Sequence, residues 1–465
     1  MRKLSLTFIV LLGSMLTALA AQPKYVFYFI GDGMGLGHVL STETYNRTVL
    51  GNSEHLTMLQ FPVTTICTSY SASSKITDSA AAGTALSTGS KAKNYTLGLT
   101  PDGNNCYSLA TDLKKQGYGI AVASSVPIDD ATPAAFYAHV ENRKMFYEIG
   151  LDLAKSNYDF FAGTKLRGLK DKDGKENDLM KTIKQSGYTV VYGADGYNRE
   201  KSKKHPKMLL LSTDNGQEHN GFTIDSTATN LSLEFITAAC MEHLQKYSPE
   251  KFFMMVEGGN IDWAAHSNDG GTVIKEILNF DKSIQLAYDF YKQHPDETLI
   301  VVTADHNTGG MALGVSKGPK EVDLGVFDYQ RTSLELFQNY CLDLQKSGKQ
   351  VTWEEMKAIL KAKFGFFGAV NVSEKREKQL QEAFNRTFVT RDAGDEKTLY
   401  ATFSEFVKIV FDIQNHCAGI GWTSTSHTGD FTPVFAVGVG AEQFNGLRDN
   451  TDLPLILRRL TGVSQ

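Results

Sequence analysis

The chain has 465 residues, of which 42% are hydrophobic and 21% are charged, a composition typical of globular rather than disordered or fibrous proteins. This length is sufficient for a large core, either one enlarged α/β domain or a domain with a long insertion. The formal net charge is −5, so the overall charge gives no reason to expect nucleic acid as a specific partner.

Residues 1–21 have the pattern of a cleavable signal peptide. Arg2 and Lys3 precede an apolar run over residues 4–16, and small residues follow it. The alternative is an uncleaved membrane anchor, but no later stretch has the ~20 apolar residues that a transmembrane helix needs. We therefore expect a secreted or periplasmic protein without a membrane anchor. Its five cysteines have no C-x-x-C spacing, which argues against a cysteine zinc site, and their disulfide pairing cannot be assigned.

Unbroken apolar runs along the chain predict strands that are buried on both faces of a sheet. These runs are residues 24–30, 119–124, 159–162, 188–192, 208–212, 252–256, 299–302 and 433–438. Amphipathic helical patterns lie between them, at residues 108–116, 232–247 and 272–294. Strands that alternate with helices predict an α/β fold with a large, mostly parallel central sheet and helices on both faces.

Residues 311–420 interrupt this alternation. They are polar and rich in helical patterns, for example at residues 353–363 and 373–384, and the last predicted strand comes only after them. We expect a helix-rich insertion, or cap, between residues 22–310 and 421–465 of one core. The alternative is a separate domain, but motifs on the two sides look like halves of one site.

Three of the predicted strands end in acidic or acid–histidine residues. Asp32 follows the first strand, Glu257 and Asp262 follow the strand at 252–256, and Asp305-His306 follow the next one. Ligands of open α/β sheets collect beyond the carboxyl ends of the strands. These segments therefore predict a polynuclear metal site at one edge of the sheet.

Two histidines fit this prediction only in combination with the other motifs. Asp262 and His266 are spaced i, i+4 on one face of a helix, and a carboxylate with an imidazole suits zinc. A lone histidine such as His266 is more commonly a core or surface residue. His427, in a polar loop, is equally ambiguous by itself.

Ser79 precedes a run of small residues that is typical of a closely packed helix. A serine at a helix N-terminus lies in a field that favours an oxyanion, and the nearby backbone N–H groups can bind phosphate. Asp78-Ser79 is also a common N-cap, which is the favoured interpretation for this segment alone.

Asp130 and Thr132 follow another predicted strand, and their oxygens together with Glu257 suit a magnesium ion. The alternative is a turn in which Pro133 fixes the preceding residue. Arg143, further along this segment, has a guanidinium that can bind two phosphate oxygens, although a lone arginine is usually a solvated surface residue.

Taken together and in this order, the motifs resemble those of the alkaline phosphatase family. They lie at residues 31–35, 77–81, 130–135 with His139 and Arg143, 256–266, 303–306 and 426–429. The resemblance spans about residues 26–440. It covers residues 311–420 only as a place where this family carries variable insertions.

The resemblance implies two zinc ions and one magnesium ion. Asp262, His266 and His427 would hold one zinc, and Asp32, Asp305 and His306 the other. Asp32, Thr132 and Glu257 would hold the magnesium, with Asp130 helping through water. Ser79 would be the nucleophile and Arg143 the phosphate clamp, which Asp78 orients. Trp263 and His139 would lie behind these groups.

The implied activity is hydrolysis of small-molecule phosphate monoesters through a phosphoserine intermediate. A serine hydroxyl is a weak nucleophile at neutral pH, and zinc favours its alkoxide. Because the clamp recognises phosphate rather than the alcohol, we expect broad specificity. Homodimers are common in the family, although the sequence shows no interface.

Trp263 departs from the family pattern. Well-studied members often have Lys or His after the aspartate at this position, and a Lys there can contact phosphate through water and pair with the residue at Asp130. Trp263 can do neither, so we expect phosphate to be held more loosely and released faster.

Two other functions are compatible with parts of this pattern. A phosphodiesterase or sulfatase of the same superfamily is one, but sulfatases need a modified Cys or Ser in a different motif, and diesterases lack an equivalent of Arg143. A non-catalytic phosphate- or metal-binding protein is the other. It would have lost a nucleophile or a ligand, whereas Ser79 and every expected ligand are present.

Overall fold

The computed structural model describes residues 22–171, 173–213, 221–225, 231–315 and 321–463. The predicted signal peptide, residues 1–21, lies outside them. Within these ranges, no helix has the length and hydrophobicity that a membrane span requires. All five cysteine thiols lie in the described ranges and are free.

A ten-stranded sheet forms the centre of the molecule, in the order β16-β2-β15-β8-β1-β7-β3-β4-β6-β5. In that order the strands are Arg448–Asp449, Val63–Thr68, Thr432–Gly438, Thr298–Thr303, Tyr25–Ile30, Phe252–Glu257, Gly119–Ser124, Phe160–Gly163, Met208–Leu211 and Thr189–Tyr192. Only β15 runs antiparallel to its neighbours, β2 and β8, and the other pairs are parallel. The predicted fold class, a large and mostly parallel sheet, is confirmed.

All eight predicted strands are present, and their bounds differ from the prediction by one residue or less. The sequence did not predict β2. Its residues, VTTICT, include only two that are buried, Val63 and Cys67. A strand with partly exposed threonines has no unbroken apolar run by which it could be recognised.

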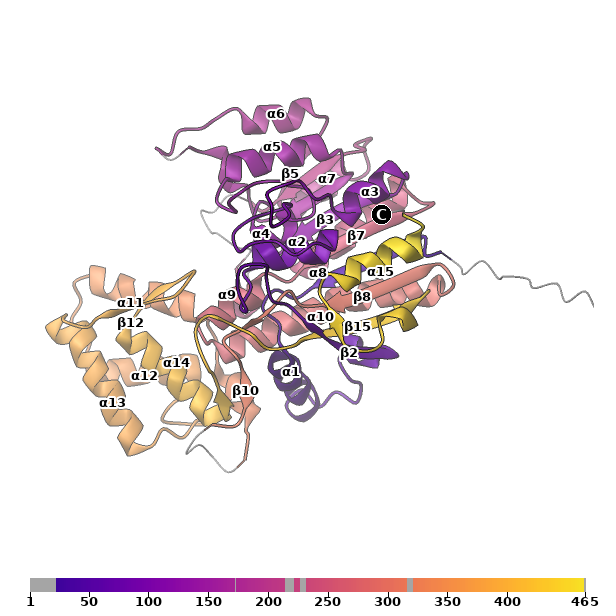
Figure 1. Ribbon diagram of the computed structural model, residues 1–465. Coiled ribbons are helices and arrows are strands. Elements are labelled where there is room, and N and C mark those ends of the chain that lie inside the picture. The colour runs from indigo at the N-terminus through magenta and orange to yellow at the C-terminus, as the bar shows by residue number, and fades with distance from the viewer. Residues whose placement is uncertain (1–21, 172, 214–220, 226–230, 316–320, 464–465) are drawn as a thin grey trace, which may run out of the picture.

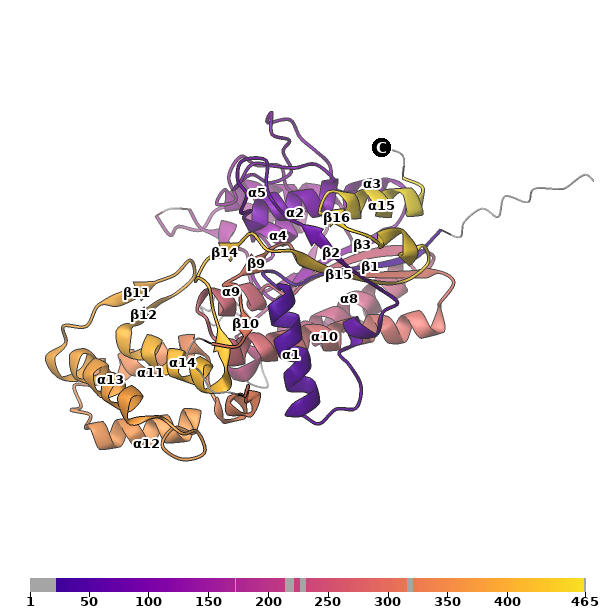
Figure 2. The same ribbon diagram turned by 60° about the horizontal axis from the view of Figure 1, so that its bottom comes forward.

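Helices cover both faces of the sheet because successive residues of the buried strands point to opposite sides. Phe27 and Phe29 of β1 pack with the helices α8 and α10 on one face. Val26, Tyr28 and Ile30 pack with α2, α3 and α15 on the other. Figure 2 shows these layers, with α2, α3 and α15 above the sheet and α1, α8 and α10 below it.

The helices of the core confirm the predicted helical patterns at residues 108–116, 232–247 and 272–294. The helices are α1 Leu36–Thr48, α2 Ser79–Thr88, α3 Leu109–Lys115, α4 Ala131–Ala134, α5 Phe146–Ser156, α6 Leu179–Gln185, α7 Gly193–Glu200, α8 Leu233–Tyr247, α9 Asn260–His266, α10 Gly270–Gln293 and α15 Asp452–Thr461. Short 3-10 turns join them at Thr57–Gln60, Arg167–Leu169 (η2), Thr223–Asp225, Leu324–Tyr329 and Ala441–Phe444.

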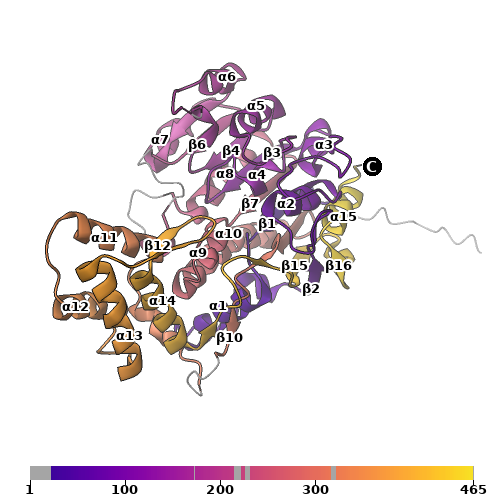
Figure 3. The ribbon, with the colours of Figure 1, turned by 60° about the vertical axis from the view of Figure 1, so that its left-hand side comes forward.

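Residues 311–315 and 321–420 form a helical lobe to one side of the sheet (Figures 1 and 3). Its elements are α11 Leu334–Lys346, α12 Trp353–Phe364, α13 Glu374–Phe384, a π-helical turn Asn385–Thr390, α14 Glu405–Ala418, and the paired strands β11 Asp395–Lys397 and β12 Thr402–Ser404. At its base, β10 (Ala312–Leu313) pairs with β13 (Ile420–Gly421), which brings the two ends of the segment together.

Candidate metal and phosphate site

The three acidic segments follow β1, β7 and β8, which are adjacent in the sheet. Ile30 of β1 is in register with Glu257 on one side and with Thr303 on the other, so the three strands end at the same level. Asp32 and Asp305 follow within two residues. The sequence-based expectation that these segments meet at one edge therefore agrees with the geometry.

Asp32, Asp305 and His306 offer ligand atoms that all lie within 4.8 Å of one another. His306 Nε2 is 3.3 Å from Asp32 Oδ1 and 3.2 Å from Asp305 Oδ2. All three residues are buried, with exposed fractions of 5% or less. This is the set that the family resemblance assigns to one zinc ion.

Asp262, His266 and His427 form a second group beside the first. His266 Nε2 lies 3.4 Å from Asp262 Oδ2 and 3.1 Å from His427 Nε2. Asp262, His306 and His427 offer ligand atoms that all lie within 4.8 Å of one another, whereas His266 is not a member of that set. His306 therefore lies between the two groups. β14 (His427–Thr428) pairs with β9 (Asn307–Thr308), which brings His427 back from beyond the helical lobe.

Hydrogen bonds fix the orientation of the histidine rings. Nδ1 of His266 lies 2.7 Å from the carbonyl oxygen of Thr425, and Nδ1 of His427 lies 2.9 Å from that of Thr77. Because a carbonyl only accepts, each Nδ1 carries the hydrogen and each Nε2 has a free lone pair. Two Nε2 lone pairs that face each other at 3.1 Å suit a cation rather than a hydrogen bond.

The carboxylates provide a second test of metal fit. Asp32 Oδ1, Asp262 Oδ2 and Asp305 Oδ2 are buried oxygens without a hydrogen-bond partner in the described part of the chain. Burial, together with the neighbouring carboxylates, raises the pKa of Asp32 well above its usual value, and burial raises that of Asp305 to about 7. Buried carboxylates so close together need positive charge, and the nitrogen and oxygen donors around them fit a bound metal ion.

The expected magnesium ligands also lie together. Thr132, in the short helix α4, donates from Oγ1 to Asp32 Oδ2 at 3.4 Å. Glu257 accepts a hydrogen bond from Ser124, the last residue of β3. Burial raises the pKa of Glu257 to about 8. The set is all-oxygen and anionic, as a hard cation prefers.

Ser79 is the first residue of α2, and the N-cap interpretation of its segment is confirmed. Asp78 caps the helix by accepting from the backbone N–H of Ala81 at 3.0 Å. Capping by Asp78 leaves the Ser79 hydroxyl free to face the cluster, where its Oγ lies 3.1 Å from His306 Nε2. The hydroxyl thus lies at a helix N-terminus and next to a candidate metal ligand.

Arg143 lies between two carboxylates. Its NH1 is 3.3 Å from Asp78 Oδ2 and its NH2 is 3.0 Å from Asp130 Oδ1. Burial opposes the charge of Asp130, but the guanidinium groups of Arg167 and Arg143 lower its pKa to about 2. The fork of Arg143 is therefore oriented from both sides.

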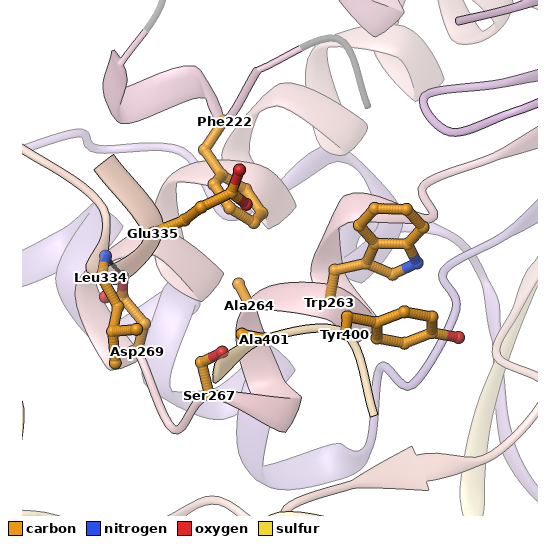
Figure 4. Close-up of a pocket in the computed structure, with 9 residues that line it drawn as sticks. All are labelled: Phe222, Trp263, Ala264, Ser267, Asp269, Leu334, Glu335, Tyr400 and Ala401. Atoms are coloured by element: carbon orange, nitrogen blue, oxygen red, sulfur yellow. Dashed lines mark hydrogen bonds between the residues drawn. The ribbon is translucent and has the colours of Figure 1, made fainter. Parts of the chain in front are cut away.

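Trp263 and His139 lie in different surroundings. The Trp263 ring stacks on Tyr400, with centroids 4.5 Å apart and an interplanar angle of 14°. Figure 4 shows these two rings face to face at one side of a pocket that Phe222 and Glu335 also line. His139, in contrast, packs against the ring of Tyr107 at 4.9 Å and donates from its backbone to Asp152.

Four residues that contact this site were not predicted from the sequence: Ser124, Arg167, Thr308 and Tyr400. Thr308 donates to Asp262, and its Oγ1 lies 3.2 Å from His306 Nδ1. Its position two residues after His306 was the available signal. Tyr400, in the helical lobe, lies 5.2 Å from the His266 ring, and no pattern in the sequence pointed to it.

The fold and the site define a class: α/β proteins that gather a carboxylate–histidine cluster and a serine at the carboxyl edge of a mostly parallel sheet. The chain belongs to the alkaline phosphatase family, whose sequence profile, described as Alkaline phosphatase, matches residues 23–164 and 156–463. The resemblance inferred from the motifs is confirmed, and so is the expectation of an enzyme of this family.

Individual relatives agree with this assignment. The chain is 30% identical over 449 residues to alkaline phosphatase 4 of Bacillus subtilis, covering 95% of this chain and 89% of that protein. It superimposes on the cold-active alkaline phosphatase of a psychrophilic Shewanella with a TM-score of 0.78, at 26% identity and with 95% and 100% of the two chains covered. The Thermus thermophilus alkaline phosphatase shares the fold, with a TM-score of 0.76 at 22% identity over 98% and 96% of the two chains.

Proposed function

We propose that the protein hydrolyses phosphate monoesters to an alcohol and inorganic phosphate, through a covalent phosphoserine at Ser79. One observation carries the proposal: the Ser79 hydroxyl lies at the N-terminus of α2, 3.1 Å from His306 Nε2. His306 offers a ligand atom within 4.8 Å of Asp32 and Asp305, and also one within 4.8 Å of Asp262 and His427.

Two zinc ions and one magnesium ion are the cofactors that we propose. Asp262, His266 and His427 would hold one zinc, and Asp32, Asp305 and His306 the second. Thr132 and Glu257 would hold magnesium with Asp32. When bound, these ions would lower the pKa of coordinated hydroxyl groups and neutralise phosphate oxygens.

The side chains of the protein bind the phosphate group and supply the nucleophile. Arg143, oriented by Asp78 and Asp130, binds two phosphate oxygens and keeps the phosphorus in line with Ser79 Oγ. Attack forms the Ser79 O–P bond as the bond from phosphorus to the alcohol oxygen breaks. Water then attacks the phosphoserine, which releases phosphate and restores the hydroxyl.

We further propose that residues 22–310 and 421–465 form one core, with residues 311–420 inserted. β8 precedes the lobe and β15 follows it, yet the two pair in one sheet. The export signal at residues 1–21, with secretion or a periplasmic location, and the homodimer stay predictions from the sequence and the resemblance.

Hydrolysis of a small panel of substrates tests the proposed activity. Purified protein should release p-nitrophenol from p-nitrophenyl phosphate at least about a hundredfold faster than from the bis ester or the sulfate ester. The bis ester has one free oxygen fewer, and both alternative substrates carry one negative charge rather than two, so Arg143 and bound cations would stabilise them less. EDTA should abolish this activity, and zinc with magnesium should restore it. Preference for the bis ester or sulfate would favour the rival hydrolases, and no turnover after metal loading would favour a binding protein.

A further inference from the structure

A second arginine, Arg167, lies behind the candidate phosphate clamp. It is the first residue of η2, and its NH1 lies 3.1 Å from Asp130 Oδ2. The other oxygen of the same carboxylate accepts from Arg143. Asp130 thus bridges two guanidinium groups, one oxygen to each.

The surroundings hold Arg167 firmly. Its guanidinium carbon lies 5.3 Å from the centre of the Phe146 ring and 5.7 Å from that of Trp263, within the range of cation–π contacts. The next residue, Gly168, donates its backbone N–H to the buried Asp129 at 2.9 Å. A Cβ at Gly168 would lie 2.3 Å from the carbonyl oxygen of Phe146, so the turn fits tightly against its neighbours.

Arg167 brings a second positive charge to the carboxylates that contact Arg143. Asp78 and Asp130 both contact Arg143, and these three side chains alone carry a net charge of −1. With Arg167 on Asp130, the four side chains are neutral. Without Arg167, a phosphate dianion that approaches Arg143 would meet three side chains with a net negative charge. The repulsion would be strong because these side chains are largely shielded from water.

We propose that Arg167 is a positioning residue for phosphate binding, acting through Asp130. It fixes the carboxylate that orients Arg143 and offsets its negative charge, so that Arg143 keeps its attraction for phosphate. This inference rests on the proposed function, since it assigns Arg143 as the phosphate clamp.

The same arrangement adds a packing role for Trp263 to the expectation drawn from the family pattern. The sequence indicated that Asp130 lacks the cationic partner that a lysine at position 263 could provide. Arg167, from another segment, pairs with Asp130 in place of such a lysine. The guanidinium of Arg167 lies beside the ring of Trp263. Tyr400 stacks on that ring in turn, so the helical lobe supports it.

Substitution of Arg167 tests the proposal. Arg167→Ala should raise the inhibition constant of inorganic phosphate and the KM for p-nitrophenyl phosphate about 10- to 100-fold, with kcat changed less than about threefold, because the loss falls on phosphate affinity. Arg167→Lys should raise both constants less, because lysine keeps the positive charge. Some loss should remain, because lysine lacks the planar guanidinium group. Arg199→Ala, at an exposed arginine on α7, is the matched control and should leave all three constants unchanged.

A double-mutant cycle separates positioning from a direct or purely structural role. If Arg167 acts through Asp130, Arg167→Ala should change the phosphate inhibition constant less than about threefold in an Asp130→Asn background. Effects that add in full would overturn the proposal, as would an unchanged inhibition constant in Arg167→Ala alone. Thermal unfolding checks that each variant folds, and Arg167→Gln replaces the alanine variant if it does not. Inactive wild-type protein would refute the proposed function, whereas an active wild type with a silent Arg167→Ala refutes only this inference.

Discussion

Replacing Ser79 by alanine should reduce kcat for p-nitrophenyl phosphate at least about a thousandfold, equivalent to about 4 kcal/mol of transition-state stabilisation. In the proposed reaction the Ser79 hydroxyl attacks the phosphorus of the substrate, and water attacks only the phosphoserine that results. Residual activity would come from direct attack by water on a substrate that Arg143 still holds. Substrate binding should therefore survive, and KM should change far less than kcat.

Ser87→Ala is the matched control for this substitution. Ser87 is also buried and lies on the same helix, α2, but its hydroxyl donates to the carbonyl oxygen of Ala135 at 2.8 Å. Its loss should affect stability rather than kcat. Steady-state kinetics and intact-protein mass spectrometry of enzyme quenched in acid are the measurements. A Ser79→Ala variant with more than a tenth of the wild-type kcat would contradict the assignment of the nucleophile.

Asp305→Asn should change stability in opposite directions with and without metal. Asp305 is fully buried close to Asp32, so without metal at pH 8 the removal of one carboxylate charge relieves repulsion and should stabilise the protein by about 1–3 kcal/mol. With zinc present the variant should lose the stabilisation that bound metal gives, about 4 kcal/mol for zinc at a thousand times its Kd. Activity should fall at least about a hundredfold. Substitution of a residue that only hydrogen-bonds to a metal ligand typically costs about 10- to 100-fold, and loss of a ligand itself should cost at least as much.

Asp281→Asn is the control for a buried carboxylate far from the cluster. Asp281 accepts from the backbone N–H groups of Thr57 and Met58 at 2.8 and 3.1 Å. Its substitution should shift the unfolding midpoint equally in EDTA and in zinc. Denaturant unfolding of both variants in the two conditions gives the comparison. If Asp305→Asn shifts stability with the same sign in both, Asp305 does not bind metal.

Most of the fold could be predicted from the sequence, because strands buried on both faces of a parallel sheet consist of unbroken apolar runs. The segment 252–256 is an example, and it was found to within one residue as β7. β2 was missed because Thr64 and Thr65 in it are not buried, so its pattern resembles a loop. Half-buried strands such as β2, which lies next to the edge strand β16, have no signature as strong as the fully buried strands at the centre of the sheet.

Much of the candidate site was also predictable, because its acidic residues lie at or directly after the carboxyl ends of parallel strands. Ligands of open α/β sheets bind at that edge. Asp32, Glu257 and Asp305 are the clearest cases. Arg167 and Tyr400 could not be predicted in this way. Arg167 is one arginine in a polar turn, and Tyr400 reaches Trp263 from a lobe 137 positions further along the chain, a contact that only the folded chain reveals.

Anomalous X-ray diffraction at the zinc edge, on crystals of the zinc-loaded protein, tests the central claim most directly. The account predicts two zinc peaks about 4 Å apart, one beside Asp262, His266 and His427 and the other beside Asp32, Asp305 and His306, with Ser79 Oγ facing them. Zinc peaks away from these six side chains in active protein would contradict it.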